Sequence, residues 1–378
     1  MRFIYADPAL MDNLGHPATT CRYVIRELGK RGIKAEVFGF RGMRPELQSE
    51  LGAAAHFRAH TFAAYDPDPI CGWLKIFDAS TEMTREDLLH LPAINCNDLV
   101  YFNSAQPAQL MAIIHWLAGL PPERSPQVVV EFGSEPGLDI AMSSTGFSCS
   151  TRDPRRDPRA AFFRLAGSKI SPHVQNQLHM MTFDRQTAII FTELIQRPVG
   201  LLPLPHHAVA PLRRRGGDPL TVGVLGHQRP EKGYALMPGI ARRLLRERSQ
   251  IRILAHNGGP EQMPDTQRAM RALAALDRRI IIDERTAGPA VWAELLGASD
   301  IILCPYDPNR FRAAYSAVAV EAVANAIPLV GPAGSSIERL IQECGDCGTV
   351  FEEFEENSIA AATILAIDDL DRYASAVL

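Results

Sequence analysis

The chain has 378 residues, 46% of them hydrophobic, which is too long for one ordinary core and predicts two domains. Its net charge of −4 gives no general attraction to nucleic acid, and no apolar run reaches the ~20 residues that cross a bilayer. The first residues are typical of a strand and not of a signal peptide, and seven scattered cysteines favour a reducing, cytoplasmic location.

In the first half, short apolar runs alternate with helical patterns, which predicts a parallel sheet with helices on both faces. The predicted strands are 2–6, 34–40, 98–102 and 127–132, and the predicted helices are 18–31, 108–118 and 184–196. Residues 133–160 are rich in Gly, Ser, Pro, Asp and Arg, so we expect a long loop or a partly mobile segment there.

Polar residues follow several of these strands. Gly15 would let the chain approach a ligand closely, and His16 would lie at the mouth of a site, with a simple helix start as the alternative for both. Glu131 and Glu135 are close in sequence, so they could bind the hydroxyls of a substrate, or one could serve as a base. Further polar candidates, with turns or caps as the alternative, are Asn103, Ser104 and Gln106.

A Pro-containing and basic segment separates the two halves. Residues 208–219 combine Arg213–Arg215 with Gly and Pro, a composition typical of an interdomain connection. We therefore expect a first domain at 1–205, a linker at 206–219 and a second domain at 220–378, whose last helix can pack back on the first domain. His206 and His207 follow the Pro-rich hinge and are expected to be structural.

The alternation of strands and helices resumes after the linker. Strands are predicted at 220–225, 251–255, 279–283, 300–304, 328–330 and 348–352, with helices between them, the first over 234–248. The chain as a whole predicts an α/β protein of two doubly wound, Rossmann-like domains that face a cleft. Ligands of such domains bind at the carboxyl edges of the sheets.

The most informative segment is Gly226–Gly233, which follows the first strand of the second half and precedes a helix. A strand, a tight turn and a helix direct backbone N–H groups toward anions, and Arg229 and Lys232 add two cations. Glu321, on a later helix, offers a carboxylate that can accept from ribose hydroxyls. This pairing indicates a nucleotide-activated donor.

These motifs resemble the donor domain of group-1 (family-4-like) glycosyltransferases with the GT-B fold. The resemblance covers residues 200–350 and implies that Lys232 binds the donor diphosphate and that Glu321 holds the ribose. His227 stands where the family has an Arg, and Arg229 would supply the missing guanidinium from a shifted position.

The remaining site residues follow from these positions together with the resemblance, which makes 1–205 the acceptor-side domain and 220–378 the donor-side domain. Those expected to bind the nucleotide are Gly15, Gly226, His227, Lys232, Gly233, Gly258, Tyr315, Ser316, Ala317 and Glu321. Those expected to act in catalysis are Lys232, Arg229, Glu131 and His16. Backbone N–H groups at a helix start can face a phosphate, and a Gly-rich turn lets a flat ring lie against the backbone. Ala313 replaces the first of the family's two glutamates, which leaves nucleotide binding better supported than turnover.

The resulting prediction is an enzyme that moves a sugar from a nucleoside-diphosphate-sugar to a hydroxyl acceptor, with retained configuration as the resemblance implies. No metal and no separate cofactor are expected, since Asp66-Pro-Asp68 matches a metal-binding pattern without a clear strand before it. The acceptor would be a glycan, a lipid-linked molecule or a small molecule. A lipid-linked acceptor would bring the basic segments 151–159 and 213–215 peripherally to an anionic membrane.

Two other classes stay open. A non-catalytic relative that binds a nucleotide or glycan, or that serves as a partner subunit, is motivated by Ala313 and His227. Another enzyme on the same scaffold, such as a sugar-nucleotide epimerase or a phosphorylase, would be recognised by its products.

Overall fold

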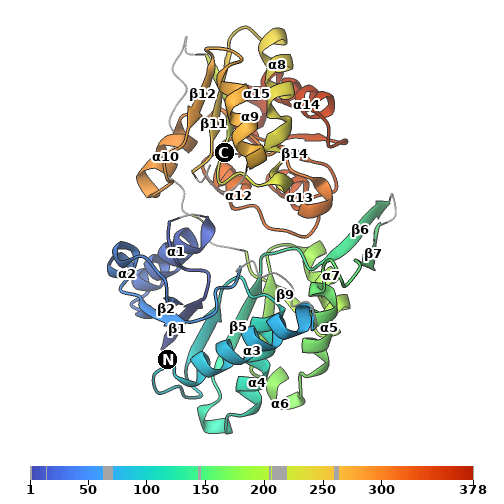
Figure 1. The fold of residues 1–378 in the computed structure, drawn as a ribbon. Coiled ribbons are helices and arrows are strands. Elements are labelled where there is room, and N and C mark those ends of the chain that lie inside the picture. The colour runs from blue at the N-terminus through green and yellow to red at the C-terminus, as the bar shows by residue number, and fades with distance from the viewer. Residues whose placement is uncertain are drawn as a thin grey trace. The chain divides into compact units, whose positions relative to one another are not determined.

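The chain divides into two compact units, drawn in Figure 1. The computed structural model describes residues 2–13, 15–62, 71–143, 146–203, 206, 219–258 and 264–377. Unit 1 comprises Met1–Asp12 and Thr20–Pro205, and unit 2 comprises Asn13–Thr19 and His206–Leu378. Asp66, Asp68, His207, Arg213–Arg215 and most of the expected linker lie outside the described residues.

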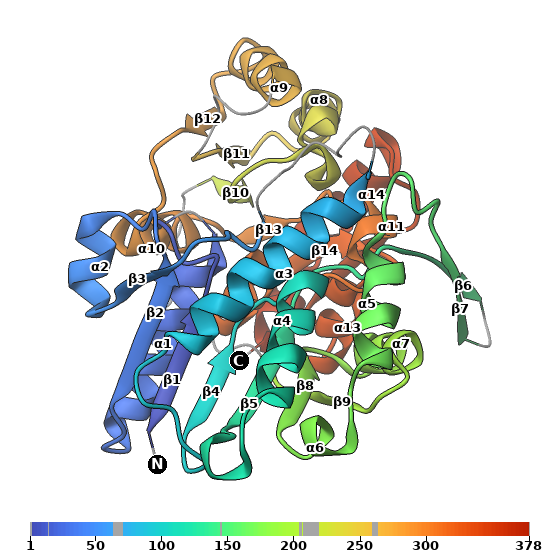
Figure 2. The ribbon, with the colours of Figure 1, turned by 60° about the horizontal axis from the view of Figure 1, so that its bottom comes forward.

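Unit 1 is built on a parallel sheet of seven strands in the order β3-β2-β1-β4-β5-β8-β9. The strands are β1 (Phe3–Asp7), β2 (Ala35–Phe40), β3 (Ala54–Phe57), β4 (Leu99–Phe102), β5 (Gln127–Phe132), β8 (Leu178–Thr182) and β9 (Val199–Leu201). The helices are α1 (His16–Lys30), α2 (Pro45–Leu51), α3 (Trp73–Leu89), α4 (Pro107–Ala118), α5 (Arg159–Ser168), α6 (Pro172–Gln175) and α7 (Arg185–Ile195), with a 3-10 turn at Pro122–Arg124. Figure 2 shows α3 and α4 packed side by side over one face of this sheet.

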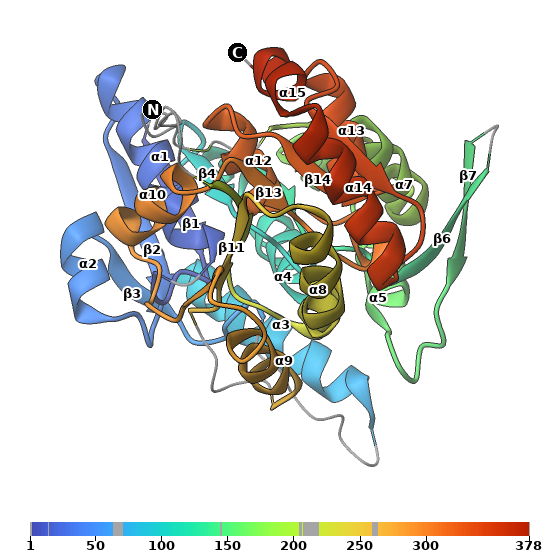
Figure 3. The ribbon, with the colours of Figure 1, turned by 90° about the horizontal axis from the view of Figure 1, so that it is seen from above.

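The expected loop at 133–160 is wrong, because a β-hairpin occupies much of it. Strands β6 (Leu138–Ser143) and β7 (Gly146–Thr151) pair antiparallel, and Figure 3 shows them as an arm that extends beyond α5 and α7. Partly buried ion pairs hold the base of the arm: Arg152 lies 2.8 Å from Glu135, and Arg159 also pairs with Glu135. The polar composition of the segment therefore reflects an exposed hairpin and its anchoring charges.

Unit 2 is built on a parallel sheet of six strands in the order β12-β11-β10-β13-β14-β15. The strands are β10 (Leu220–Val224), β11 (Ile251–His256), β12 (Ile280–Asp283), β13 (Ile301–Leu303), β14 (Leu329–Pro332) and β15 (Gly348–Phe351). The helices are α8 (Met237–Glu247), α9 (Pro264–Ala274), α10 (Pro289–Gly297), α11 (Pro308–Phe311), α12 (Ala317–Ala324), α13 (Ser336–Glu343), α14 (Glu356–Asp368) and α15 (Leu370–Val377). All six strands expected from the sequence are confirmed, whereas the helix expected from 234 begins with a 3-10 turn at Tyr234–Leu236 and becomes α-helical at Met237.

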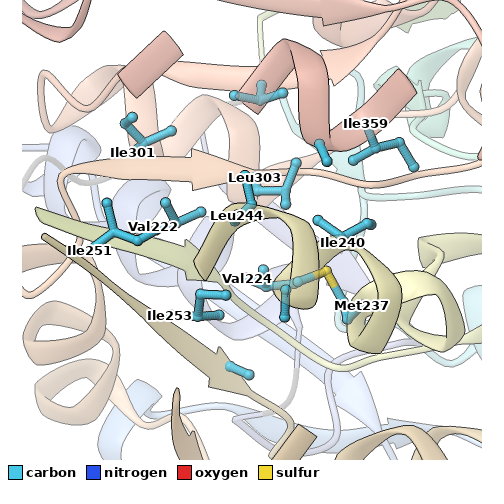
Figure 4. Packing of buried hydrophobic residues seen from close by; sticks show 14 of the residues in the cluster. Val222, Val224, Met237, Ile240, Leu244, Ile251, Ile253, Ile301, Leu303 and Ile359 are labelled. Carbon is cyan, nitrogen blue, oxygen red and sulfur yellow. The ribbon is translucent and has the colours of Figure 1, made fainter. Parts of the chain in front are cut away.

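Buried apolar side chains form two clusters in unit 2, and β10 contributes Leu220, Val222 and Val224 to the first. On one face a buried cluster, shown in Figure 4, joins residues of β10, β11, β13, α8 and α14. Its labelled members are Val222, Val224, Met237, Ile240, Leu244, Ile251, Ile253, Ile301, Leu303 and Ile359. Leu225 and Leu254 belong to a second cluster with α10 and α12. Burial on both faces fixes the carboxyl ends of these strands, from which the polar turns of unit 2 emerge.

Candidate functional site

The turn after β10 can be built only with glycine at two positions. Gly226 has φ +99°, and a Cβ there would lie 3.2 Å from Val318 and 3.5 Å from the Nζ of Lys232. Gly233 has φ +65°, and a Cβ there would lie 1.8 Å from the carbonyl oxygen of Pro305. The turn therefore packs against Pro305, just after the end of β13, and the Lys232 ammonium lies close to Gly226 at the start of the turn.

A network of buried side chains holds the same turn in place. The N–H of Gly226 donates to His256 Nδ1 at 3.1 Å, so the proton of that ring is on Nε2, which donates to the carbonyl of Arg285 at 2.9 Å. Gln228 donates from Nε2 to the carbonyls of Gly226 and His256. His227, beside it, is half-buried. Sequence reasoning missed Gln228, because its partners come from the next strand and no motif marks it.

Gly258 completes the rim at the end of β11. A Cβ there would lie 3.3 Å from the carbonyl oxygen of Arg285 and 3.4 Å from the ring of His256. These close neighbours belong to the protein's own chain, and the contact of Gly258 with a nucleotide stays a prediction.

Lys232 is a cation that lacks a partner of opposite charge within the described parts of the chain. Its Nζ lies 5.3 Å from the centre of the Tyr306 ring, and no described carboxylate forms an ion pair with it. Burial, and next the charge of Arg229, lower the pKa of Lys232 to about 8. Arg229 has a half-exposed side chain and pairs with Glu231 at 3.1 Å. An unpaired cation in such surroundings attracts an anionic ligand.

The segment Asn13–Thr19, which includes the first turn of α1 and groups with unit 2, adds the two candidates from the start of the chain. The His16 ring lies 6.2 Å from the Tyr315 ring. Burial lowers the pKa of His16 to about 4, with further contributions from the charges of His206, Arg229 and Lys232. His16 is therefore neutral at neutral pH and can offer a hydrogen bond but no charge. Gly15 precedes it in the same segment.

Glu321 is buried on α12, and both of its carboxylate oxygens already accept hydrogen bonds. Oε1 accepts from Nδ1 of His206 at 2.9 Å, and Oε2 accepts from the indole N–H of Trp292. The His206 ring also stacks on Tyr315, with 5.5 Å between centres. His206, expected to be a structural hinge residue, is therefore joined to a candidate ligand-binding carboxylate. No sequence signal marks His206 or Trp292, since their partner is remote in the chain.

The start of α12 is confirmed at Ser316 and Ala317. Ser316 is the N-cap, and its Oγ accepts from the N–H of Ala319 at 3.3 Å. Ala313, just before the helix, is buried with 1% exposure. A glutamate at that position would have to bury its carboxylate, so the local packing matches the alanine that the sequence carries.

The acidic candidates of unit 1 differ from expectation, because neither carboxylate faces outward. Glu131 lies inside β5 with 0% exposure and accepts from the hydroxyl of Tyr101. Burial raises the pKa of Glu131 to about 8 and that of Asp7, at the end of β1, to about 7. Glu135 is bound to the arginines that anchor the hairpin. Contact of Glu131 or Glu135 with an acceptor hydroxyl is therefore not supported by their positions.

The other polar candidates of unit 1 form part of its framework. Asn103 donates to the Asp7 carboxylate at 2.8 Å, and Ser104 is buried. Gln106 forms a capping box with Gln109 at the start of α4. Across the described residues there is no group of three or more His, Cys, Asp or Glu placed to hold a metal ion, and no helix among them is long and apolar enough to span a membrane.

Comparison with known proteins shows the fold. No protein-family model matches the sequence, and no curated protein matches it. Among solved structures, HepE of Anabaena in complex with UDP and glucose is 14% identical with a TM-score of 0.61, covering 100% of this chain and 92% of that one. A glycosyltransferase of Rickettsia africae is 12% identical with a TM-score of 0.61, covering 100% and 93%. Sucrose-phosphate synthase of Thermosynechococcus elongatus is 12% identical with a TM-score of 0.62, covering 100% and 92%.

These likenesses extend over the whole chain and confirm the expected fold. The protein consists of two Rossmann-like α/β units, as in GT-B glycosyltransferases. At this level of identity the similarity establishes the fold, whereas the activity depends on the residues of the site.

Proposed function

We propose that the protein is a glycosyltransferase that moves a sugar from a nucleoside-diphosphate-sugar to a hydroxyl acceptor. The observation that carries the proposal is the unpaired Lys232 ammonium above a glycine turn at the carboxyl end of β10. In a doubly wound sheet this edge is where nucleotides bind. The presence of UDP in the HepE complex of the same fold supports a nucleoside diphosphate as the ligand.

The proposed chemistry is electrostatic stabilisation of the leaving group. The bond between the sugar carbon and the diphosphate oxygen breaks, the acceptor oxygen forms a new bond to that carbon, and the acceptor proton is released. Negative charge then grows on the diphosphate, where Lys232 and Arg229 offset it without a metal ion. We propose retained configuration, on the basis of the sequence resemblance, and a glycan, lipid-linked or small-molecule acceptor.

A nucleotide panel is the first test. We expect UDP, GDP, ADP or dTDP, or one of their sugars, to raise the unfolding temperature of the protein. Ligand at ~100 times its dissociation constant adds about 2.7 kcal/mol to the folded state. If none of these nucleotides changes the unfolding temperature at millimolar concentration, the proposal is wrong.

A transfer assay with the donor so identified tests the role of Lys232. Removing one charge contact to a developing anion typically lowers kcat by ~10²–10³, so Lys232→Met should show a loss of this size. Lys169→Met removes an exposed lysine of unit 1 and should leave kcat unchanged. Equal activity of the two variants would contradict the proposed mechanism.

A non-catalytic nucleotide-binding protein is the second candidate, favoured by the buried Ala313 where the family carries a glutamate. This candidate predicts nucleotide-induced stabilisation without transfer to any acceptor. An epimerase would instead convert the donor sugar in the absence of acceptor. Product analysis with and without acceptor separates the three activities.

A further inference from the structure

His206 pairs with Glu321 through one ring nitrogen, and on the far side of its ring no described residue bonds to the other nitrogen. Nδ1 of His206 donates to Glu321 Oε1, while Trp292 occupies Oε2. The His206 side chain is 1% exposed and that of Glu321 is 5% exposed. Nε2 of His206 is buried, and no described residue forms a hydrogen bond with it.

The hydrogen bond to Glu321 determines what the free nitrogen can do. A carboxylate only accepts hydrogen bonds, so the proton of the neutral ring stays on Nδ1 and Nε2 becomes an acceptor. A buried acceptor without a donor is costly, which favours a ligand that brings an O–H or N–H group.

Tyr315 connects His206 with the candidate site, because the rings of both His206 and His16 lie against the Tyr315 ring. The ring stacks on Tyr315, and the same His16 whose pKa is lowered by His206 is also affected by Arg229 and Lys232. A ligand held there must therefore combine negative charge for the cations with a donor for Nε2. A nucleoside diphosphate has both, because its ribose hydroxyls lie within a few bonds of the diphosphate.

We propose that His206 contacts the ribose of the bound nucleotide, with Nε2 accepting a hydrogen bond from a ribose hydroxyl. Glu321 and Trp292 are then positioning residues: Glu321 holds the imidazole in the required tautomer, and Trp292 holds Glu321. This inference rests on the proposed function, and it differs from the sequence resemblance, in which Glu321 itself would hold the ribose. The engaged oxygens of Glu321 are the reason for the difference.

Calorimetric titration of UDP, 2′-deoxy-UDP and 3′-deoxy-UDP tests the contact, with the corresponding GDP or ADP series if that nucleotide is the one that binds. The wild-type protein should bind the parent nucleotide about three- to tenfold more tightly than the analogue lacking the contacted hydroxyl. His206→Asn keeps a donor near the position of Nδ1 and removes Nε2, so it should lose this discrimination. His115→Asn, at an exposed histidine of α4, should retain it.

Glu321→Asp provides a second variant if His206→Asn does not fold. It withdraws the carboxylate by one methylene and should weaken the discrimination by loosening the imidazole. Discrimination that survives in His206→Asn, or in Glu321→Asp where that variant is the one used, would overturn the assignment of the ribose to His206. Failure of the wild-type protein to bind any of these nucleotides would overturn the proposed function and this inference with it.

Discussion

The positive charges of individual side chains at the carboxyl edge of the unit 2 sheet determine how strongly this site attracts an anionic ligand. His16 is neutral at neutral pH because burial lowers its pKa to about 4, so Lys232 and Arg229 carry the positive charge. The role of Lys232 follows from a local motif and could be predicted from the sequence. The partners of Glu321 could not, since His206 and Trp292 meet it only after α10 and α12 have packed.

The affinity for a nucleoside diphosphate should fall as the pH rises through about 8. The ammonium of Lys232, whose pKa is about 8 in the free protein, loses its charge there, while the diphosphate is already fully ionised. A charged hydrogen bond lost in this way weakens binding about tenfold or more. Titrations from pH 6.5 to 9.5 would show the decline in the wild type and a flat profile in Lys232→Met. The same decline in both would assign it to another group.

Glu131 should make unit 1 less stable as the pH rises. Its pKa is raised to about 8 in the folded protein, above the ordinary value near 4.5. Ionising Glu131 in the folded protein therefore costs stability. This loss is absent below the pKa that Glu131 has in the unfolded chain, and it grows with pH until the pH exceeds the pKa in the folded protein. The unfolding free energy of Glu131→Gln relative to the wild type should therefore increase by at least ~1 kcal/mol from pH 5.5 to pH 8.5. Urea unfolding at the two pH values measures this change.

Glu135→Gln is the matched control for this measurement. Its carboxylate is paired with two arginines, so the variant should be destabilised and should show no gain at the higher pH. A stability difference for Glu131→Gln that does not change with pH would rule out the buried carboxyl as its cause.

At the scale of elements, the strands of unit 2 could be predicted because each is a short, continuous apolar run between turn residues. The β6–β7 hairpin could not, because most of its side chains are exposed and its sequence has the composition of a loop. What stabilises it is the pairing of Arg152 and Arg159 with Glu135. These ion pairs form only when α5 has packed in place, and they produce no periodic pattern in the sequence from which the hairpin could be predicted.

The glycine turn after β10 should not tolerate a methyl group. Gly233→Ala would place a Cβ 1.8 Å from the carbonyl oxygen of Pro305 at φ +65°, so we expect a loss of more than ~2 kcal/mol of unfolding free energy. Gly29→Ala, in α1, meets no atom within 4 Å and should gain ~0.5–1 kcal/mol. Chemical denaturation of the two variants checks the contrast, and equal stabilities would mean that the turn relaxes.

At the scale of the whole molecule, the two units have separate sheets and separate cores. The sequence predicted this division from its length and from the basic segment between the halves. It did not predict that residues 13–19 would group with the second unit, because this segment includes the first turn of α1 and has no local feature that separates it from the rest of that helix.

Nucleotide binding should protect unit 2 from hydrogen exchange more than unit 1. The turns at 226–233 and 256–258 and the start of α12 belong to the candidate site, so their amides should exchange more slowly when UDP or another binding nucleotide is added. Mass spectrometry of exchanged peptides would measure this, with α3 and α4 as internal references. Uniform protection of both units would speak against a site confined to unit 2.

The origin of unit 2 from two stretches of chain has a practical consequence for dissecting the protein. A fragment that starts at His206 would lack the seven residues 13–19, and with them the ring that faces Tyr315. Protease cleavage or expression of the halves from separate genes would therefore yield an incomplete downstream piece. Completing it would require adding the missing heptapeptide as a separate peptide or fusing it to the fragment through a linker.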